Sequence, residues 1–246
     1  MTYVRPDVSG QSPLVTNDWA EVLRPDLQDR TAPVYGVVVH TTGSGIVDKA
    51  LAAGADPLEA AMAYYRASDY CAHYVVGYRG EVAQVADEHK KAMHVGLPGS
   101  DHGAFLDGSW ATTLTPAFVA AWRARWPQYA SPAHLFPGPS VNNVTVGVEM
   151  LPWQAGCPGV PDEPGLKYTR FQHLAVAALA ADVAKRWGFP AGWARSGRLA
   201  GHEDLNPLER VTKSGLGWDP GITRPGSLPW IDWGLITRTA EPPVVA

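Results

Sequence analysis

Cysteine is scarce in this chain, which has only Cys71 and Cys157 in 246 residues. A disulfide framework is therefore excluded, and the two thiols are compatible with a reducing compartment or with one bridge. Long apolar runs are also missing: residues 174–184 form the longest nearly apolar stretch, and they contain Asp182. Such a stretch is too short to span a bilayer. The first residues lack the basic and apolar regions of a secretory signal. We therefore expect a soluble protein that is made in the cytoplasm and does not insert into membranes.

An excess of positive charge is absent as well. The 20 Lys and Arg residues are outnumbered by 24 Asp and Glu, so the formal net charge is −4. This balance argues against a nucleic-acid partner, because such proteins neutralise phosphates with basic residues. Apolar residues make up 46% of the chain, which is typical of a globular protein. The 25 Gly and 22 Pro residues indicate many loops.

Short β-branched segments predict buried strands at residues 34–40 and 144–150. Residues 72–86 have the pattern of a β-hairpin with its turn at Arg79-Gly80. Helices are predicted by the capping signals at three places: Asp56-Pro57, Thr115-Pro116, and Thr169 with Gln172. Gly188 is placed to end the last of these helices.

The order of these elements predicts an α/β fold with a central mixed β-sheet flanked by helices. We expect one catalytic domain over residues 34–222, with an insertion at about residues 97–140 that contains a single helix. Residues 1–33 are expected to be an N-terminal extension and residues 223–246 a C-terminal tail. The segment from residue 200 to the end has a loop-like composition, rich in Gly, Pro and Trp.

Two histidines and two acidic residues are candidates for chemistry. His40 ends the first predicted strand, Glu149 interrupts an apolar strand, and His202 and Asp219 lie in Gly- and Pro-rich surroundings. Each of them taken alone has an ordinary structural explanation, such as a buried hydrogen-bonded histidine or a turn aspartate. Two imidazoles and one carboxylate can together hold Zn²⁺ and leave a fourth position for water. A neighbouring carboxylate can then carry a proton to a leaving group.

Six segments, in this order, carry a family resemblance. They are Val37–Gly43, Ala72–Val76 with Arg79–Val82, Ala92–Gly96, Asn143–Glu149, Tyr168-Thr169 with Gln172, and Gly201–Asp204 with Asp219–Gly221. This series resembles the zinc-dependent N-acetylmuramoyl-L-alanine amidases of the type 2 class, which also include peptidoglycan recognition proteins and many phage endolysins. The resemblance covers residues 34–96 and 141–222.

The resemblance implies roles for individual residues. His40, His202 and Asp219 take the positions of the zinc ligands, and Glu149 takes that of the general acid and base. His94 takes a position that lines the substrate groove. His73 is expected to be structural or to support a ligand from behind.

One position departs from the pattern of many relatives, which carry a lysine two residues before the third ligand. Gly217 stands there in this chain. Lys213 could fold back to stabilise a developing oxyanion, or it could be a solvated loop lysine. Arg210 is a weaker substitute for the missing lysine. Among the tryptophans, Trp110, Trp153 and Trp218 are candidates for a glycan or peptide groove, whereas core packing is the default interpretation of the others.

The implied activity is hydrolysis of the amide between N-acetylmuramic acid and the L-alanine of the stem peptide, with zinc as cofactor and peptidoglycan or a muropeptide as partner. We expect a monomeric phage or prophage endolysin that acts on the cell wall after release. A cytoplasmic enzyme that recycles soluble anhydro-muropeptides is the nearest alternative. A peptidoglycan-binding protein without catalytic activity is the alternative from another class.

Overall fold

The computed structural model describes residues 10–16, 24–97, 99–136, 140–154, 157, 166–211, 219–221 and 231–242. Its strands are β1 (Gly36–Thr41), β2 (Tyr74–Val76), β3 (Val82–Gln84), β4 (Thr145–Met150) and β5 (Leu199–Gly201). Its helices are α1 (Ser44–Ala52), α2 (Pro57–Ala67), α3 (Gly99–Asp107), α4 (Trp110–Thr113), α5 (Pro116–Arg125), the 3₁₀ helix η2 (Pro132–His134), α6 (Val141–Val144), α7 (Arg170–Arg186), α8 (His202–Leu205), α9 (Pro207–Arg210) and α10 (Trp233–Ala240). Within these residues, no helix is both long and apolar enough to cross a bilayer.

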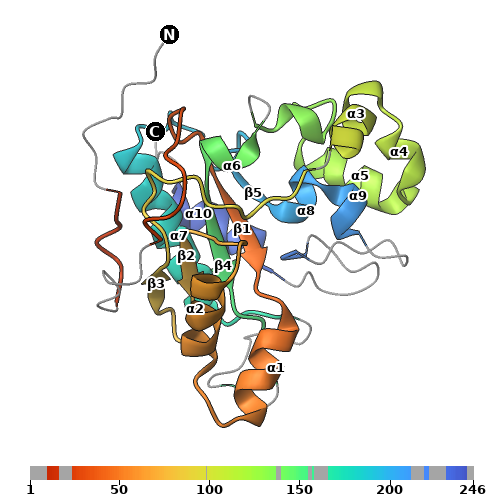
Figure 1. Cartoon of the computed structure of the whole chain (residues 1–246). Coiled ribbons are helices and arrows are strands. Elements are labelled where there is room, and N and C mark those ends of the chain that lie inside the picture. The colour runs from red at the N-terminus through yellow and green to blue at the C-terminus, as the bar shows by residue number, and fades with distance from the viewer. Residues whose placement is uncertain are drawn as a thin grey trace.

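The strands form one mixed sheet in the order β3-β2-β4-β1-β5 (Figure 1). Strands β2, β4, β1 and β5 run parallel, and β3 pairs antiparallel with β2 at one edge. The register places His40 directly beside Glu149 on the neighbouring strand. The carboxyl ends of parallel strands meet at one edge of a sheet, so residues at or just beyond those ends are brought together.

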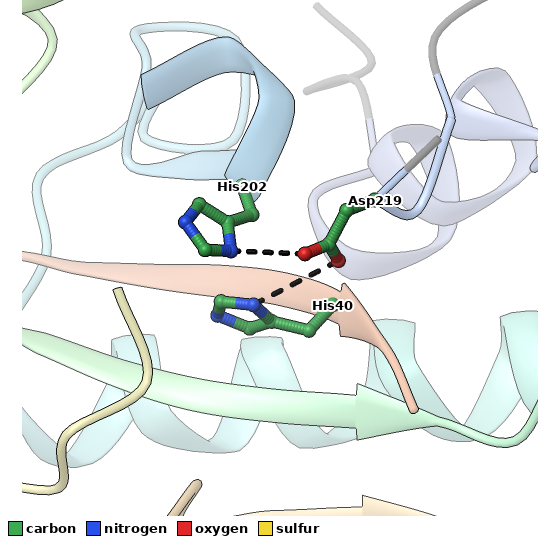
Figure 2. A group of neighbouring side chains, drawn as sticks. All are labelled: His40, His202 and Asp219. Atoms are coloured by element: carbon green, nitrogen blue, oxygen red, sulfur yellow. Dashed lines mark ion pairs between the residues drawn. The ribbon is translucent and has the colours of Figure 1, made fainter. Parts of the chain in front are cut away.

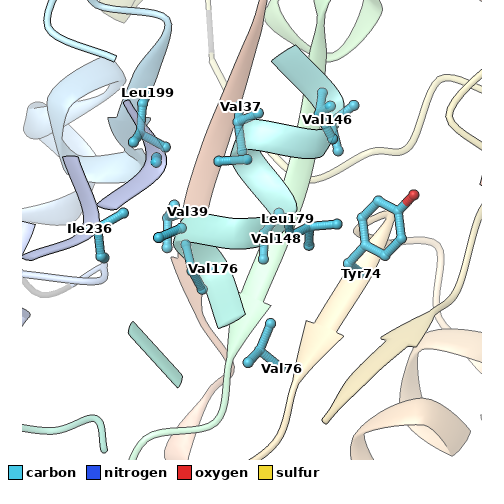
Figure 3. Close-up of a cluster of buried hydrophobic side chains, with 14 of the residues drawn as sticks. Val37, Val39, Tyr74, Val76, Val146, Val148, Val176, Leu179, Leu199 and Ile236 are labelled. Carbon is cyan, nitrogen blue, oxygen red and sulfur yellow. The ribbon is translucent and has the colours of Figure 1, made fainter. Parts of the chain in front are cut away.

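The two faces of the sheet are covered by different helices. Side chains at alternate positions of a strand point to opposite faces, and Val37, Val39, Val146 and Val148 pack against α7 and α10 (Figure 3). Val38, on the opposite face, packs in a second cluster with the aromatic side chains of α3, α4 and α5. A third cluster joins β2 and β3 to α1 and α2. This arrangement confirms the expected α/β fold with a mixed sheet between helices.

Local capping signals predicted three helices correctly. The Asp56 carboxylate accepts hydrogen bonds from the backbone N–H groups of Leu58 and Glu59 at the start of α2. Thr115 caps α5, and Thr169 forms the expected capping box with Gln172 at the start of α7. The hairpin at residues 72–86 is also confirmed. These features depend on neighbouring residues only, which explains why the sequence reveals them.

Other expectations about secondary structure were wrong. Residues 97–140 contain α3, α4 and η2 in addition to the single predicted helix. The expected turn after β1 continues into α1, and the segment from residue 200 holds α8, α9 and α10, of which α10 packs in the core. Short helices with Gly and Pro nearby are set by tertiary packing rather than by propensity.

Trp110 is a further correction. The sequence placed it in a loop as a candidate for the substrate groove, but it begins α4 and is only 1% exposed. Its ring packs edge-to-face on Trp122, with 5.1 Å between the ring centroids. Trp153 is half-buried against the third hydrophobic cluster, and Trp218 lies outside the described residues.

A buried ionic network joins the sheet to α7. The fully buried Glu88 carboxylate accepts two hydrogen bonds from the Arg186 guanidinium, each 2.7 Å long. It also accepts from the indole of Trp187 and from the hydroxyl of Tyr74, each at 2.6 Å. The network satisfies both oxygens of a carboxylate that is wholly removed from water.

Substitution of Glu88 by alanine is expected to lower the free energy of unfolding by about 3–5 kcal/mol. It removes the fully buried carboxylate partner of Arg186, which then keeps its contact with Asp182, and it also removes the acceptor of the Trp187 indole. Urea denaturation measures this change. Asp29→Ala is the matched control, since its salt bridge with Lys90 is exposed and contributes at most about 1 kcal/mol. Equal effects of the two variants would show that the network does not stabilise the fold.

Candidate metal centre and active site

Three predicted ligand residues meet beyond the carboxyl ends of two neighbouring strands. His40 lies on β1, and His202 begins α8 directly after β5. Asp219 joins them from a later part of the chain (Figure 2). One candidate ligand atom from each residue lies within 4.8 Å of the others, and all three residues are buried. The structure therefore brings together the three residues that the sequence marked as ligands.

The Asp219 carboxylate lies between the two imidazoles. Its Oδ2 is 2.9 Å from Nδ1 of His202, and its Oδ1 is 3.8 Å from Nδ1 of His40 (Figure 2). The backbone N–H of Thr41 donates a hydrogen bond of 2.8 Å to Oδ1. Burial raises the pKa of the Asp219 carboxyl, but His202 and His40 outweigh this effect and hold the pKa well below its usual range. The carboxylate is therefore ionised under all ordinary conditions.

The surroundings of His202 fit a bound cation. Its Nδ1 is buried and, within the part of the chain that the structure describes, forms no hydrogen bond, although the Asp219 carboxylate is close. A buried polar atom without a partner is costly unless something else satisfies it. Two imidazole nitrogens and one carboxylate oxygen are the ligands of catalytic zinc sites with an open fourth position. The residues present thus fit a divalent metal ion.

Glu149 lies beside His40 on the same face of the sheet and is 8% exposed. Burial is the main reason that the pKa of its carboxyl rises to about 7, and the nearby His40 partly offsets that rise. The hydroxyl of Thr42 lies 3.4 Å from Oε2 and donates to it, and the side chain of Tyr65 also hydrogen bonds to the carboxyl. A carboxyl group with this pKa can both accept and release a proton near neutral pH.

His94 is in direct contact with the ligand residue His40. Its Nδ1 is 2.9 Å from Nε2 of His40, and its Nε2 is 3.1 Å from the hydroxyl oxygen of Thr145. Both ring nitrogens are therefore hydrogen bonded inside the protein. Burial, together with His40 and other nearby cationic groups, lowers the pKa of His94 well below its usual value, so the ring is neutral.

His73 is buried behind His94, with 5.8 Å between the ring centroids. The backbone N–H of Gly147 donates to its Nδ1, and its Nε2 lies 3.1 Å from the carbonyl oxygen of Lys90. His73 therefore joins β4 to the segment after the hairpin, and it is not part of the three-residue ligand cluster.

A cavity of about 760 Å³ opens from this cluster toward α1 and α2. The ligand residues, Glu149 and Arg210 line one part of it, and Lys49, Tyr64, Tyr70 and Met93 line another. Tyr64, Tyr70 and Met93 are 44%, 67% and 45% exposed. Large exposed aromatic groups beside a polar centre are typical of a binding surface.

Arg210 lines the cavity beside the ligand residues. Its Nε lies 3.5 Å from Asp219 Oδ2 and 3.5 Å from His202 Nε2. From the sequence, Arg210 was expected to be a weaker substitute for the lysine than Lys213. Lys213 and Gly217 lie outside the described residues.

The sequence analysis did not identify the polar residues that contact Glu149 and His94, which are Thr42 and Thr145. A signal for Thr145 was present, because alternation along β4 places it on the same face as Glu149. Thr42 follows β1 directly and could have been found from its place beside His40.

Comparison with known proteins gives one family and a few solved structures. The family model described as N-acetylmuramoyl-L-alanine amidase matches residues 30–221. A selenomethionine derivative of AmpD is similar at 18% identity and a TM-score of 0.49, with 94% of this chain and 97% of that chain covered. The Ph2119 endolysin from a Thermus scotoductus bacteriophage is similar at 14% identity and a TM-score of 0.40, with 92% and 96% covered. No curated protein sequence matches the chain.

Proposed function

The chain belongs to the N-acetylmuramoyl-L-alanine amidase family, and on that premise we propose that it is a zinc-dependent enzyme that cleaves the amide between N-acetylmuramic acid and L-alanine in peptidoglycan. The observation that carries this proposal is the buried cluster of His40, His202 and Asp219 beside Glu149. A protein that only binds wall fragments has no need for a complete ligand set next to a carboxyl group with a pKa near neutrality.

The two histidines and Asp219 would hold the ion. When bound, zinc supplies Lewis acidity, which activates water and polarises an amide carbonyl. Glu149 would accept a proton from the attacking water on a carboxylate oxygen and deliver it to the nitrogen of the departing L-alanine. Thr42 and Tyr65 orient that carboxyl group through their hydrogen bonds. Glu149 and His94 form part of the cavity wall beside the ligands.

Arg210 would supply the positive charge that many relatives take from a lysine. Its guanidinium lies close to Asp219 and His202 in the cavity lining. A cation at this position would stabilise the negative charge that develops on an amide oxygen during attack. Lys213 stays a second candidate for the same role.

Arg210→Ala is therefore expected to lower kcat by about 100-fold, with a smaller change in KM, because the charge acts in the transition state. Lys213→Ala is the matched variant, and steady-state kinetics on a muropeptide distinguishes the two. If Lys213→Ala shows the large loss and Arg210→Ala does not, the assignment to Arg210 is wrong.

The domain boundaries are part of the proposal. Residues 34–222 would form the catalytic domain, and the family match over residues 30–221 supports this proposal. The insertion at about residues 97–140 would contribute α3, α4 and α5, whose aromatic side chains pack in the second hydrophobic cluster. Residues 1–33 would form an N-terminal extension and residues 223–246 a C-terminal tail, of which α10 packs in the core.

We propose polymeric cell wall, as for an endolysin, rather than soluble anhydro-muropeptides as the substrate. The exposed Tyr64 and Tyr70 beside the cavity favour a substrate that extends beyond it. The test compares the rate of amide cleavage on purified sacculi with that on soluble anhydro-muropeptides. Faster cleavage of sacculi supports an endolysin, and faster cleavage of the soluble substrate would indicate a recycling enzyme. Binding without cleavage of either would move the protein to the recognition class.

A further inference from the structure

A chain of hydrogen bonds leads from the ligand His40 into the protein. His40 Nε2 is 2.9 Å from His94 Nδ1, and His94 Nε2 is 3.1 Å from Thr145 Oγ1. Thr145 Oγ1 is in turn 2.8 Å from the carbonyl oxygen of Val141. His40, His94 and the Thr145 side chain are all buried, so water does not compete for these contacts.

The last member of this chain fixes the direction of every proton in it. A backbone carbonyl can only accept, so the Thr145 hydroxyl must donate its one proton to Val141. The same oxygen must then accept from His94, which places the proton of the neutral His94 ring on Nε2. His94 Nδ1 carries no proton and accepts from His40 Nε2. In its neutral form, His40 is therefore left with an unprotonated Nδ1.

That nitrogen of His40 is the one that faces the ligand cluster. Figure 2 shows Nδ1 of His40 on the side of Asp219 and Nε2 on the opposite side of the ring. A neutral imidazole binds a metal through its unprotonated nitrogen, and the hydrogen bond at the other nitrogen decides which one that is. The opposite tautomer would present an N–H to the metal position.

The position of His94 is itself held tightly. The Asn142 side chain accepts hydrogen bonds from the backbone N–H groups of His94 and Val95 and donates to the carbonyl of Val95. The ring packs flat on Gly147, where an added Cβ would come within 2.5 Å of the imidazole. His94 therefore has little freedom to turn and exchange its ring nitrogens.

We propose that His94 and Thr145 are positioning residues that set the tautomer of His40 before the metal arrives. The role in metal binding rests on the proposed zinc site, but the tautomer is a property of the metal-free protein and stands apart from the proposed activity. Outer partners of this kind typically change metal affinity by about 10–100-fold when they are removed.

The first test is long-range ¹H–¹⁵N NMR of the histidine rings in the metal-free wild-type protein. The inference requires His40 and His94 to be protonated on Nε2. His173 is an internal control for the opposite tautomer, because its Nδ1 must donate to the carbonyl of Thr169 while its Nε2 accepts from the backbone N–H of Asp232. A spectrum with His40 protonated on Nδ1 would overturn the inference without any variant.

The second test measures zinc affinity by chelator competition in two variants. Thr145→Val keeps the shape of the side chain but removes the hydroxyl, and Thr145→Ser keeps the hydroxyl. We expect Thr145→Val to weaken zinc binding by about 10–100-fold and to give mixed His40 tautomers, whereas Thr145→Ser stays within about threefold of the wild type. Equal affinities in Thr145→Val and the wild type would contradict the inference. Amide cleavage, measured separately, decides the proposed function.

Discussion

Glu149→Gln is expected to lower kcat for amide cleavage by about 100- to 10,000-fold while zinc affinity stays within a few-fold of the wild type. Positioned acid–base groups contribute rate factors of this size. Glutamine keeps the shape of the side chain and its hydrogen bonds, but it cannot accept and return a proton. Glu149 is outside the three-residue ligand cluster, so the ion should stay bound.

Glu149→Gln is expected to lower activity but to raise the free energy of unfolding of the metal-free protein near neutral pH. Burial raises the pKa of the Glu149 carboxyl from 4.5 to about 7, so folding favours its protonated form. A group with a raised pKa stabilises the fold below pH 4.5, and this contribution is lost as the pH rises through 7. The loss in the metal-free protein is at most about 3.5 kcal/mol, because each pKa unit corresponds to about 1.4 kcal/mol.

Glu149→Gln removes this titration. Between pH 4.5 and 8, the metal-free variant should therefore gain stability relative to the metal-free wild type, as measured by urea denaturation at several pH values. Glu59→Gln, on the exposed side of α2, is the control and should leave the pH dependence unchanged. A variant that keeps full turnover would rule out Glu149 as the proton carrier, whatever its stability.

Removal of the proposed zinc ion is expected to abolish most of the activity. Chelation is expected to lower amide cleavage by at least about 100-fold, and added zinc should restore it. Zinc should also raise the melting temperature of the wild type, because a ligand that binds only the folded state stabilises it. Asp219→Asn should weaken zinc binding by more than about 100-fold, since even outer partners contribute 10–100-fold.

Asn at position 219 keeps an oxygen for the Thr41 N–H but loses the negative charge that lies between the imidazoles. Asp48→Asn, an exposed position on α1, is the matched control and should bind zinc like the wild type. Isothermal titration with the metal-free proteins gives both affinities. Unchanged affinity in Asp219→Asn would remove Asp219 from the ligand set.

The parts of the fold that were predicted from sequence are those with local signals. Asp56 and Thr169 predict helices because their side chains cap the first turn, an interaction that needs no distant partner. Strand β5 has only three residues and is defined by its pairing with β1. The helix α10 depends on packing against α7. Strand β5 has no sequence signal that stands out from a loop, whereas α10 has a helix cap, Asp232, that the sequence analysis did not use.

In the site, too, local motifs were predictable from the sequence and distances between residues were not. The sequence marked His40, His202 and Asp219 by the order of their motifs, but their distances depend on the register of β1 between β4 and β5. Arg210 ends the short helix α9 and lies 3.5 Å from Asp219, a distance that the sequence pattern does not reveal. The proton direction through His94 depends on a carbonyl at Val141, which only the structure places there.

We propose that the cluster of His40, His202 and Asp219 holds the ion that cleaves the bond between N-acetylmuramic acid and L-alanine. The most direct test is a digest of purified sacculi with and without a chelator, analysed by mass spectrometry for the new ends. We predict free L-alanine amino termini on intact glycan strands, which disappear on chelation and return with zinc. Intact sacculi together with intact soluble muropeptides, in the presence of bound zinc, would contradict the account.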